Sequence, residues 1–238
     1  MTCIPRRVWI YWESGWTDAP ALSQKSLRSW RARNPNWAVQ PLDFCQVNRL
    51  LGASWEEARL PPWITPTGRS NLVRLALLKR YGGVWVDATN FCVRPLDHWI
   101  DRNASKGFFA FSSPTNDRPL STWFLASQPR NQLVRKWLDR CWDFWRHPVK
   151  DENRWVHRMF ADLIEKDSAA SFAWSQVETI PAKNPLHFGP NHKTLVRPVS
   201  SDIRECVQKK NCSGVQVDEP EARFPTGCNI ELVKSRSH

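Results

Sequence analysis

The sequence has no long apolar segment, no paired cysteine motif and no block of like charges. No stretch reaches the roughly 18 apolar residues that a membrane-spanning helix needs, and residues 1–11 lack the apolar core and cleavage site of a signal peptide. The seven cysteines form no CxxC pair, which argues against a zinc ribbon. Cys206, Cys212 and Cys228 are close enough in sequence for one disulfide. Most cysteines are nevertheless expected to be free, which favours a reducing compartment.

The composition is that of a folded, basic protein rich in tryptophan. Hydrophobic residues make up 41% of the 238 residues, which excludes a disordered chain. The net charge of +11 fits three kinds of partner: nucleic acid, an anionic membrane surface or a phosphorylated small substrate. Basic residues are scattered or only loosely clustered, which weakens the nucleic-acid alternative. Each of the 15 tryptophans could line a cleft or fill the core, and the sequence leaves both open.

Apolar strands alternate with amphipathic helices along most of the chain. The patterns predict strands at 8–12, 37–42, 84–86 and 108–111, and helices at 21–33, 44–51, 131–146 and 152–166. A further helix begins near Thr67 or Ser70 and ends at Gly82 and Gly83, because glycine readily adopts positive φ. This alternation predicts an α/β fold with a mostly parallel central sheet flanked by helices. We expect a single domain over 1–238, with an irregular region at about 198–238.

The most informative segment is the helix after Arg69 together with the strand that ends at Asp87. Asn71 and Arg74 are three residues apart and therefore share one face of that helix. Asp87 leaves the strand at the end of the sheet, where α/β proteins bind small ligands. A carboxylate buried there needs a partner, which implies a cation or a hydrogen-bonding ligand. The alternatives are a turn acid for Asp87, a surface ion pair for Arg74 and core packing for Trp9.

Several segments are informative in combination: residues 4–9, 29–30, 34–37, 70–74, 81–89 and 121–124. Together they resemble the capsular polysaccharide synthesis glycosyltransferases over roughly residues 4 to 190. That family is similar in turn to the Och1-like mannosyltransferases and the glucosylating clostridial toxins. The resemblance implies a GT-A (Rossmann-like) fold and a hexosyltransferase-like enzyme of capsule or other polysaccharide biosynthesis, which takes its sugar from a nucleotide-sugar.

The resemblance also implies a donor site. Asp87 matches the first acid of an Asp-x-Asp metal motif, and Thr89 stands where the second acid is expected. Asn71 and Arg74 match an Asp and an Arg that contact the donor, and Trp9 matches an aromatic residue that stacks on the base. The expected catalytic residues are Asp87 and Arg74, and the expected donor-binding residues are Trp9, Trp12, Ser70, Asn71, Arg74, Trp85 and Asp87.

The implied cofactor is Mn²⁺ or Mg²⁺, weakly held because Thr89 replaces an acid. Arg74, Arg69 or Lys193 could partly take its place, because cations pair with phosphate oxygens. His187 is a candidate further ligand, as is His192, although an isolated histidine is more often structural. Candidates for a general base, with nothing to discriminate them, are Asp117, Glu152 and Asp162.

The sequence therefore favours a metal-assisted glycosyltransferase that acts on a glycan, polysaccharide or lipid-linked acceptor. One alternative is a catalytically impaired relative that only binds a nucleotide-sugar or glycan, motivated by Asn71 and Thr89. A less favoured alternative is a basic nucleic-acid binder. We expect no nucleic-acid partner and a cytoplasmic location, with peripheral contact to the anionic inner face of a membrane as a further hypothesis. The loops at 13–20 and 112–120 are expected to shape the choice of donor and acceptor.

Overall fold

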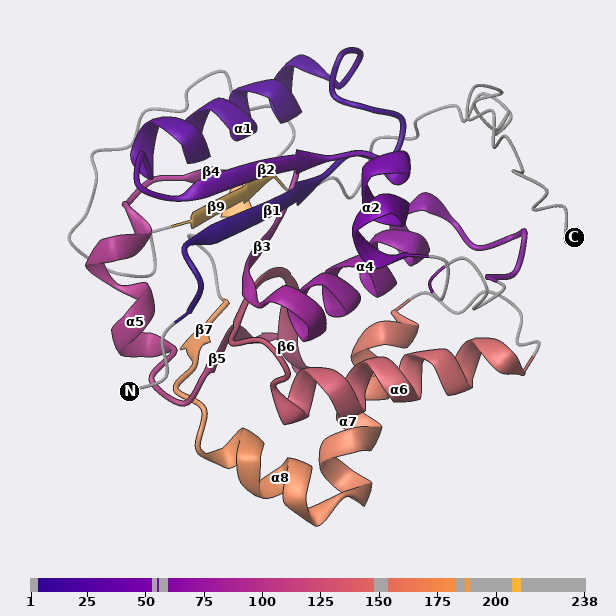
Figure 1. Cartoon of the computed structure of the whole chain (residues 1–238). Coiled ribbons are helices and arrows are strands. Elements are labelled where there is room, and N and C mark those ends of the chain that lie inside the picture. Colours follow the sequence, from indigo (N-terminus) through magenta and orange to yellow (C-terminus); the bar gives the residue numbers. More distant parts are fainter. Residues whose placement is uncertain are drawn as a thin grey trace, which may run out of the picture.

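A computed structural model describes residues 4–52, 55, 60–147, 154–182, 187–188 and 207–210. A central sheet runs through it, with helices on both faces (Figure 1). The strands are β1 (Arg7–Tyr11), β2 (Ala38–Leu42), β3 (Gly83–Asp87), β4 (Asn90–Cys92), β5 (Phe108–Thr115), β6 (Arg118–Ser127), β7 (Ile180–Pro181), β8 (His187–Phe188) and β9 (Val207–Lys210). The helices are α1 (Ala21–Arg33), α2 (Phe44–Leu51), α4 (Pro66–Tyr81), α5 (Ile100–Asn103), α6 (Gln132–Arg146), α7 (Trp155–Lys166) and α8 (Ser168–Ser175), with a 3-10 turn at Leu96–His98.

The sheet has the strand order β2-β1-β3-β6-β5-β7. β1 runs parallel to β2 and β3, and β5 runs parallel to β7, whereas β6 is antiparallel to both of its neighbours. A mostly parallel sheet flanked by helices confirms the α/β fold class. The short strands β4, β9 and β8 form a second sheet in that order. None of the described helices is long and apolar enough to cross a membrane.

Two segments differ from the sequence-based expectation. The loop expected at 112–120 is largely strand, because β5 continues to Thr115 and β6 begins at Arg118. The outer half of β5 alternates partly buried and exposed residues, which is a weaker sequence signal than the fully buried run at 108–111. The chain also forms helix α8 at Ser168–Ser175, where the sequence patterns predicted no element. The expectation of a single domain over 1–238 stays a prediction.

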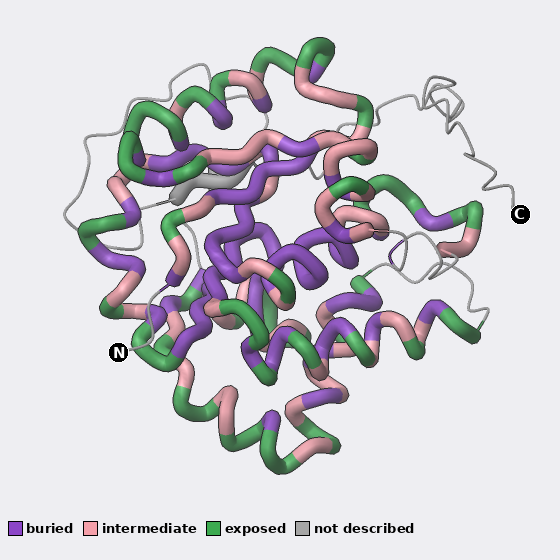
Figure 2. The backbone as a smooth tube through the Cα atoms, viewed as in Figure 1, coloured by how far each residue is buried: buried purple, intermediate pink, exposed green. Residues whose placement is uncertain are grey.

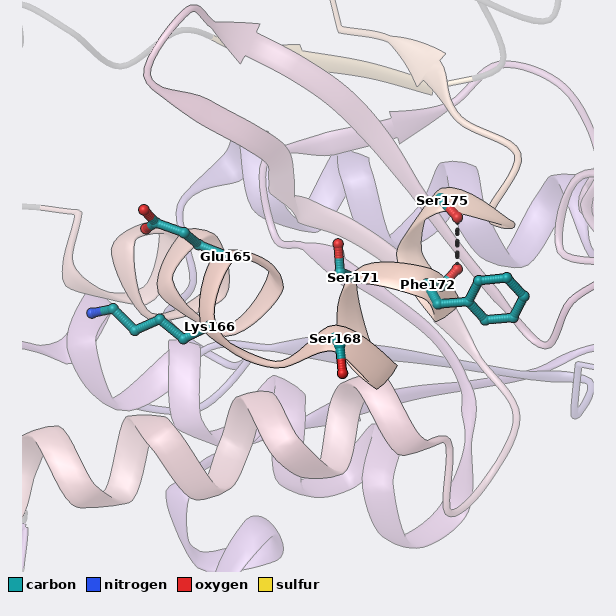
Figure 3. A pocket seen from close by; sticks show the side chains of 6 residues that line it. All are labelled: Glu165, Lys166, Ser168, Ser171, Phe172 and Ser175. Carbon is teal, nitrogen blue, oxygen red and sulfur yellow. Dashed lines mark hydrogen bonds between the residues drawn. The ribbon is translucent and has the colours of Figure 1, made fainter.

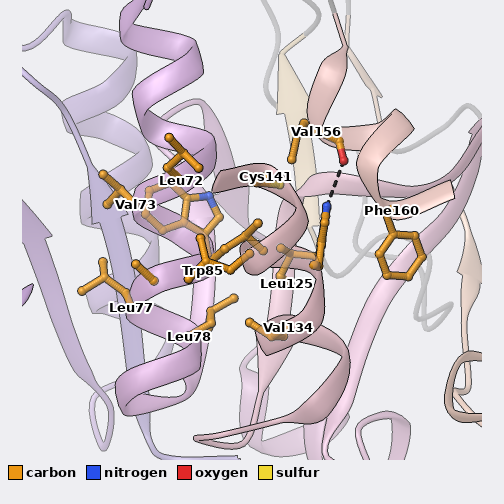
Figure 4. Close-up of a cluster of buried hydrophobic side chains, with 14 of the residues drawn as sticks. Leu72, Val73, Leu77, Leu78, Trp85, Leu125, Val134, Cys141, Val156 and Phe160 are labelled. Carbon is orange, nitrogen blue, oxygen red and sulfur yellow. Dashed lines mark hydrogen bonds between the residues drawn. The ribbon is translucent and has the colours of Figure 1, made fainter. Parts of the chain in front are cut away.

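Alternate residues of the central strands face two separate cores. In β1, Val8 and Ile10 face a core shared with α1 and α5, while Trp9 and Tyr11 face a core shared with α4, α6 and α7. Figure 4 shows the second core, in which side chains of α4 and α6 meet Trp85 and Leu125. Buried residues accordingly line the sheet and the inner sides of the helices in Figure 2.

Helix α4 is the central helix, and it begins at Pro66, before both of the predicted caps, Thr67 and Ser70. Thr65 caps it, because its hydroxyl accepts a hydrogen bond from the Gly68 N–H at 3.1 Å, and Pro66 occupies the first helical position. Thr67 and Ser70 are therefore not caps, and Asn71 lies in the second turn. The predicted glycine stop is confirmed, with Gly82 at φ +63°.

Gly83 has no room for a side chain. Its φ is +98°, and a Cβ there would lie 2.7 Å from the Arg7 carbonyl oxygen on the neighbouring strand. Gly83→Ala should therefore lower the free energy of unfolding by about 3 kcal/mol or more, from backbone strain plus the clash. Urea denaturation measures this loss.

Gly52→Ala is the matched control, because Gly52 has φ +81° but nothing within 4 Å of the added Cβ. It should cost only the strain, about 1–3 kcal/mol. Equal losses in the two variants would show that β1 and β3 do not approach each other as closely as described.

Candidate active site

The carboxyl ends of β1 and β3 place two side chains together at one edge of the sheet. Tyr11 and Asp87 are the last residues of these parallel strands and are partners in the strand register. Asp87 is accessible, with 24% of its side chain exposed, whereas Tyr11 is 6% exposed. The sequence-predicted acid thus lies at the carboxyl edge of parallel strands, within reach of solvent.

Arg74 of α4 holds Asp87 in place. One guanidinium nitrogen lies 3.2 Å from Asp87 Oδ1, and another donates to the Thr122 carbonyl oxygen at 2.6 Å. The same side chain donates to the carbonyl oxygen and the hydroxyl of Ser70, at 3.2 and 3.1 Å. The indole N–H of Trp85 also donates to Asp87 Oδ1, at 3.1 Å. Two donors from two elements therefore fix the orientation of one carboxylate.

The Arg74 guanidinium is almost fully buried, with 3% exposed. Burial lowers its pKa, and the negative charge of Asp87 acts in the opposite direction. The guanidinium stays protonated because an arginine does not release its proton in proteins. It also lies over the Trp85 ring, 5.1 Å from the ring centroid. The guanidinium is engaged by Ser70, Thr122 and Asp87. Arg74 therefore contacts Asp87 from the core side.

The three tryptophans expected at the donor site occupy different environments. Trp9 is 1% exposed and donates its indole N–H to the Gly82 carbonyl oxygen at 2.8 Å, inside the core. Trp85 is equally buried. Trp12 is half-buried and follows β1 directly, with its backbone N–H bonded to the Leu42 carbonyl oxygen at 2.9 Å. Among these three candidates, Trp12 is the one that is not fully buried.

Three further candidates lie close in sequence to Arg74 or Asp87. Ser70 is half-buried, and its hydroxyl, which accepts from Arg74, donates to the Thr67 carbonyl oxygen at 2.9 Å. Asn71 is buried on the same helix, 8% exposed. Thr89 is half-buried in the turn between β3 and β4, two residues past Asp87. The structure therefore places Arg74 in contact with both Ser70 and Asp87.

Glu13 and Tyr11 were not singled out by the sequence reasoning, which treated 13–20 as a loop. Glu13 Oε1 accepts from Arg69 Nε at 2.9 Å, so Arg69 is bonded to a carboxylate. The other Glu13 oxygen and the Tyr11 hydroxyl are buried without a hydrogen-bond partner among the described residues. Buried polar atoms of this kind are sites that a ligand can satisfy. Its position in the sequence could have identified Glu13 as a candidate. It closely follows a parallel strand, and Asp87 lies at the end of another.

The described residues offer a divalent ion few protein ligands. No group of three histidine, cysteine or acidic side chains converges within the described part of the chain. Asp87 and Thr89 supply one carboxylate and one hydroxyl. Hard divalent ions take several oxygen ligands, with waters and substrate phosphates often completing the shell. This donor set therefore fits an ion held mainly by its substrate.

The predicted histidine ligand is placed only by its backbone. In the smaller sheet, Asn90 of β4 pairs with Lys209 of β9, which pairs in turn with His187 of β8. His187 therefore lies two strand spacings, about 10 Å, from the residue after Thr89. Its role as a ligand stays a prediction, and His192 and Lys193 lie outside the described residues.

The general-base candidates are still not separated from one another by their surroundings. Asp117 is exposed at the tip of the β5–β6 hairpin, where the Thr115 hydroxyl and two arginines lower its pKa. A lowered pKa makes it a weaker base. Asp162 lies on α7, 3.7 Å from the Lys166 ammonium, and Glu152 lies outside the described residues.

A shallow pocket of about 580 Å³ lies elsewhere, against α7 and α8 (Figure 3). It is lined by Glu165, Lys166, Ser168, Ser171, Phe172 and Ser175. None of the predicted site residues contributes to it. It is open to solvent, and its polar groups do not converge as those around Asp87 do, so the sheet edge remains the candidate site.

Comparison with known proteins identifies one family over most of the chain. Residues 2–195 match the family described as "Capsular polysaccharide synthesis protein". This match includes every segment on which the resemblance was based, and it confirms the span of roughly 4 to 190.

Several fungal proteins are similar in sequence. O-glycosyltransferase PaGT of Phomopsis amygdali is 28% identical over 158 residues, which cover 59% of this chain and 39% of that protein. Glycosyltransferase afumC of Aspergillus fumigatus is 34% identical over 104 residues, covering 39% and 26%. O-glycosyltransferase braB of Annulohypoxylon truncatum is 28% identical over 173 residues, covering 60% and 41%. The chain thus spans less than half the length of these curated relatives.

Two solved glycosyltransferase structures align over most of the chain. PaToxG glycosyltransferase has 14% sequence identity and a TM-score of 0.47, covering 72% of this chain and 73% of that one. Galactosyltransferase LgtC, solved with donor and acceptor sugar analogs, has 11% identity and a TM-score of 0.48, covering 87% of each chain. At these TM-scores neither structure adds to the family assignment.

Tyr11 gives the site a measurable pH dependence. Burial and the nearby Glu13 carboxylate raise the pKa of Tyr11 far above its ordinary value of 10.0, with Arg69 opposing them. Above pH 10 the unfolded chain releases this proton and the folded protein keeps it, so stability falls as pH rises. In that range the free energy of unfolding of the wild type should fall with pH more steeply than that of Tyr11→Phe, by up to about 1.4 kcal/mol per pH unit.

Urea denaturation of both proteins from neutral pH to pH 11 measures the difference, and lysine titration cancels in the comparison. At neutral pH the variant should be as stable as the wild type or slightly more so, since it removes a buried hydroxyl with no described partner. Identical pH profiles would contradict a neutral, buried Tyr11.

Proposed function

We propose, from the premise that this chain belongs to the capsular polysaccharide synthesis protein family, that it is a nucleotide-sugar-dependent glycosyltransferase. It would move a sugar from the donor to a hydroxyl group of a glycan or polysaccharide acceptor. The observation that carries this proposal is the accessible Asp87 carboxylate at the carboxyl edge of the sheet, oriented by Arg74 and the Trp85 indole. The names of the curated relatives, two of them O-glycosyltransferases, support a hydroxyl acceptor.

The charge balance at this edge supports metal assistance. Arg74 is paired with Asp87 and Arg69 with Glu13, so these two pairs leave no net positive charge. A nucleotide diphosphate leaves with growing negative charge, which a site of this kind has to stabilise. Mn²⁺ or Mg²⁺, held by Asp87 and Thr89, would supply that charge when bound. The protein's own part is to hold the Asp87 carboxylate in one orientation.

The other contacts proposed with the nucleotide-sugar are based on how far each candidate side chain is exposed. Trp12 at the end of β1 is proposed to stack on the base, in place of the buried Trp9. The hydroxyl of Tyr11, the register partner of Asp87, and Glu13 Oε2 are buried polar atoms that the donor could satisfy. Ser70 and Asn71 lie behind Asp87 on α4 and are proposed to support the carboxylate and its arginine. The tip of the β5–β6 hairpin lies beyond the same edge, because β5 runs in the direction of β3, and it is proposed to border the acceptor.

The location stays a proposal. We propose that the protein works in the cytoplasm at the anionic face of a membrane, where lipid-linked acceptors reside. The support is its net charge of +11.

Asp87→Asn should lower kcat by roughly 100-fold to 1,000-fold, because the amide keeps the shape of the side chain but not the charge. Donor turnover and product formation with a panel of nucleotide-sugars measure this. Asp143→Asn on α6 is the matched control and should change kcat less than about two-fold, since this acid and its partner Arg146 are both largely exposed. Equal activity of wild type and Asp87→Asn would contradict the proposal.

Metal dependence separates the transferase from a relative that only binds. For a transferase, EDTA should abolish turnover and added Mn²⁺ should restore it. A nucleotide-sugar with Mn²⁺ should also raise the melting temperature more than either alone, because ligands that bind only the folded state stabilise it. A shift in melting temperature without product would support the binding-only alternative that Asn71 and Thr89 motivate. Full activity in EDTA would reject the metal.

A further inference from the structure

We infer that the outer face of α1 is an electrostatic docking surface for an anionic phospholipid bilayer. Its four basic residues, Lys25, Arg28, Arg31 and Arg33, are all exposed, and the helix contains no acidic residue. We call these four residues the α1 patch. Figure 2 shows the exposed residues of α1 along the side that faces away from the sheet. Lys25, Arg28 and Arg31 follow one another at intervals of three, so they lie along one side of the helix.

The α1 patch is uncompensated. Within the described part of the chain, none of its four cations forms an ion pair, whereas cations of α6 and α7 are paired with acids on their own helices. Arg135 pairs with Asp139, Arg146 with Asp143 and Lys166 with Asp162. Net charge alone would spread attraction over the whole surface. The absence of acids on α1 concentrates positive potential on one face.

The character of the patch favours a bilayer over other polyanions. Clusters of four or more lysines and arginines on a helix are typical of anionic lipid binding. The large apolar side chains described as exposed are Phe44, Trp63 and Phe172, and none of them lies on α1. The face therefore offers no aromatic ring for base stacking and no apolar wedge for insertion. Contact should be purely electrostatic and reversible by salt.

The α1 patch is rigidly connected to the candidate site. On the inner side of α1, Trp30 donates its indole N–H to the Asn90 carbonyl oxygen at 2.8 Å, and the Ser26 hydroxyl donates to the same oxygen. Asn90 begins β4, directly after Thr89. The Cys92 N–H also bonds to the Ser29 hydroxyl at 3.0 Å. A bilayer held by α1 would therefore fix the orientation of the Asp87 edge without covering α4, which lies on the opposite face of the sheet (Figure 1).

This inference rests on the proposed function only for its purpose, which is access to a lipid-linked acceptor. The experiment is co-sedimentation of the full chain with phosphatidylcholine vesicles, with and without phosphatidylserine, at low and high ionic strength. We expect binding only with phosphatidylserine and only at low ionic strength, because salt screens exposed charges over about 10 Å at 0.1 M. The variant K25Q/R28Q/R31Q should bind on the order of 100-fold more weakly, at about five-fold for each cation removed.

The matched control is R135Q/R146Q/K166Q, which removes the same three charges from exposed positions on α6 and α7. It should bind within a few-fold of the wild type. K25R/R28K/R31K should retain binding, which separates lost charge from lost folding, and glutamine is as good a helix former as the residues it replaces.

Four outcomes would overturn the inference: equal loss in both glutamine variants, binding to pure phosphatidylcholine, no binding to either vesicle, or binding of a DNA duplex but not vesicles through the α1 patch. None of these measurements needs sugar transfer. A protein that transfers sugar but ignores vesicles would therefore reject the α1 patch alone. Vesicle binding without transfer would leave the patch in place and reject the proposed function.

Discussion

The buried guanidinium of Arg74 is the contact on which the arrangement around the sheet edge depends. It joins α4 to β6 through the Thr122 carbonyl oxygen and to β3 through Asp87. A charge buried this deeply is tolerated only when its donors are satisfied, and loss of one partner of such a pair typically costs about 3–5 kcal/mol. Three elements distant in sequence are thereby held in one relative position. The position of the Asp87 carboxylate, which is partly exposed to solvent, depends on this arrangement.

The distribution of charge divides the described surface into two functional parts. At the sheet edge, Arg69 is paired with Glu13 and Arg74 with Asp87, so these two pairs together carry no net charge. On α1 the cations have no acidic partners among the described residues. The same basic composition therefore supports two different chemistries. The paired cations at the sheet edge orient carboxylates, whereas the cations of α1 create a positive potential that attracts anionic partners at long range.

Much of the fold follows from local patterns, and the exceptions have identifiable causes. The strand before Asp87, the glycine stop at Gly82 and the helix faces of α1, α6 and α7 all rest on period and turn chemistry, which act over a few residues. The antiparallel β6 was not predicted, since pairing direction is set by partners far along the chain. The cap of α4 was misplaced because Thr65, Thr67 and Ser70 are chemically similar capping residues. Only the observed bond to Gly68 distinguishes Thr65.

For the site, residue order along the chain was enough to show which polar residues were available and that Asp87 would end a buried strand at the carboxyl edge of the sheet. Residue order also places Asn71 and Arg74 on one helix face. Long-range packing set the rest: Trp9 is buried while Trp12 is partly exposed, Arg69 is engaged by Glu13, and Tyr11 lies beside Asp87. Burial and partner choice depend on neighbouring strands and on α4. The sequence lists these elements in order, but packing alone sets their distances.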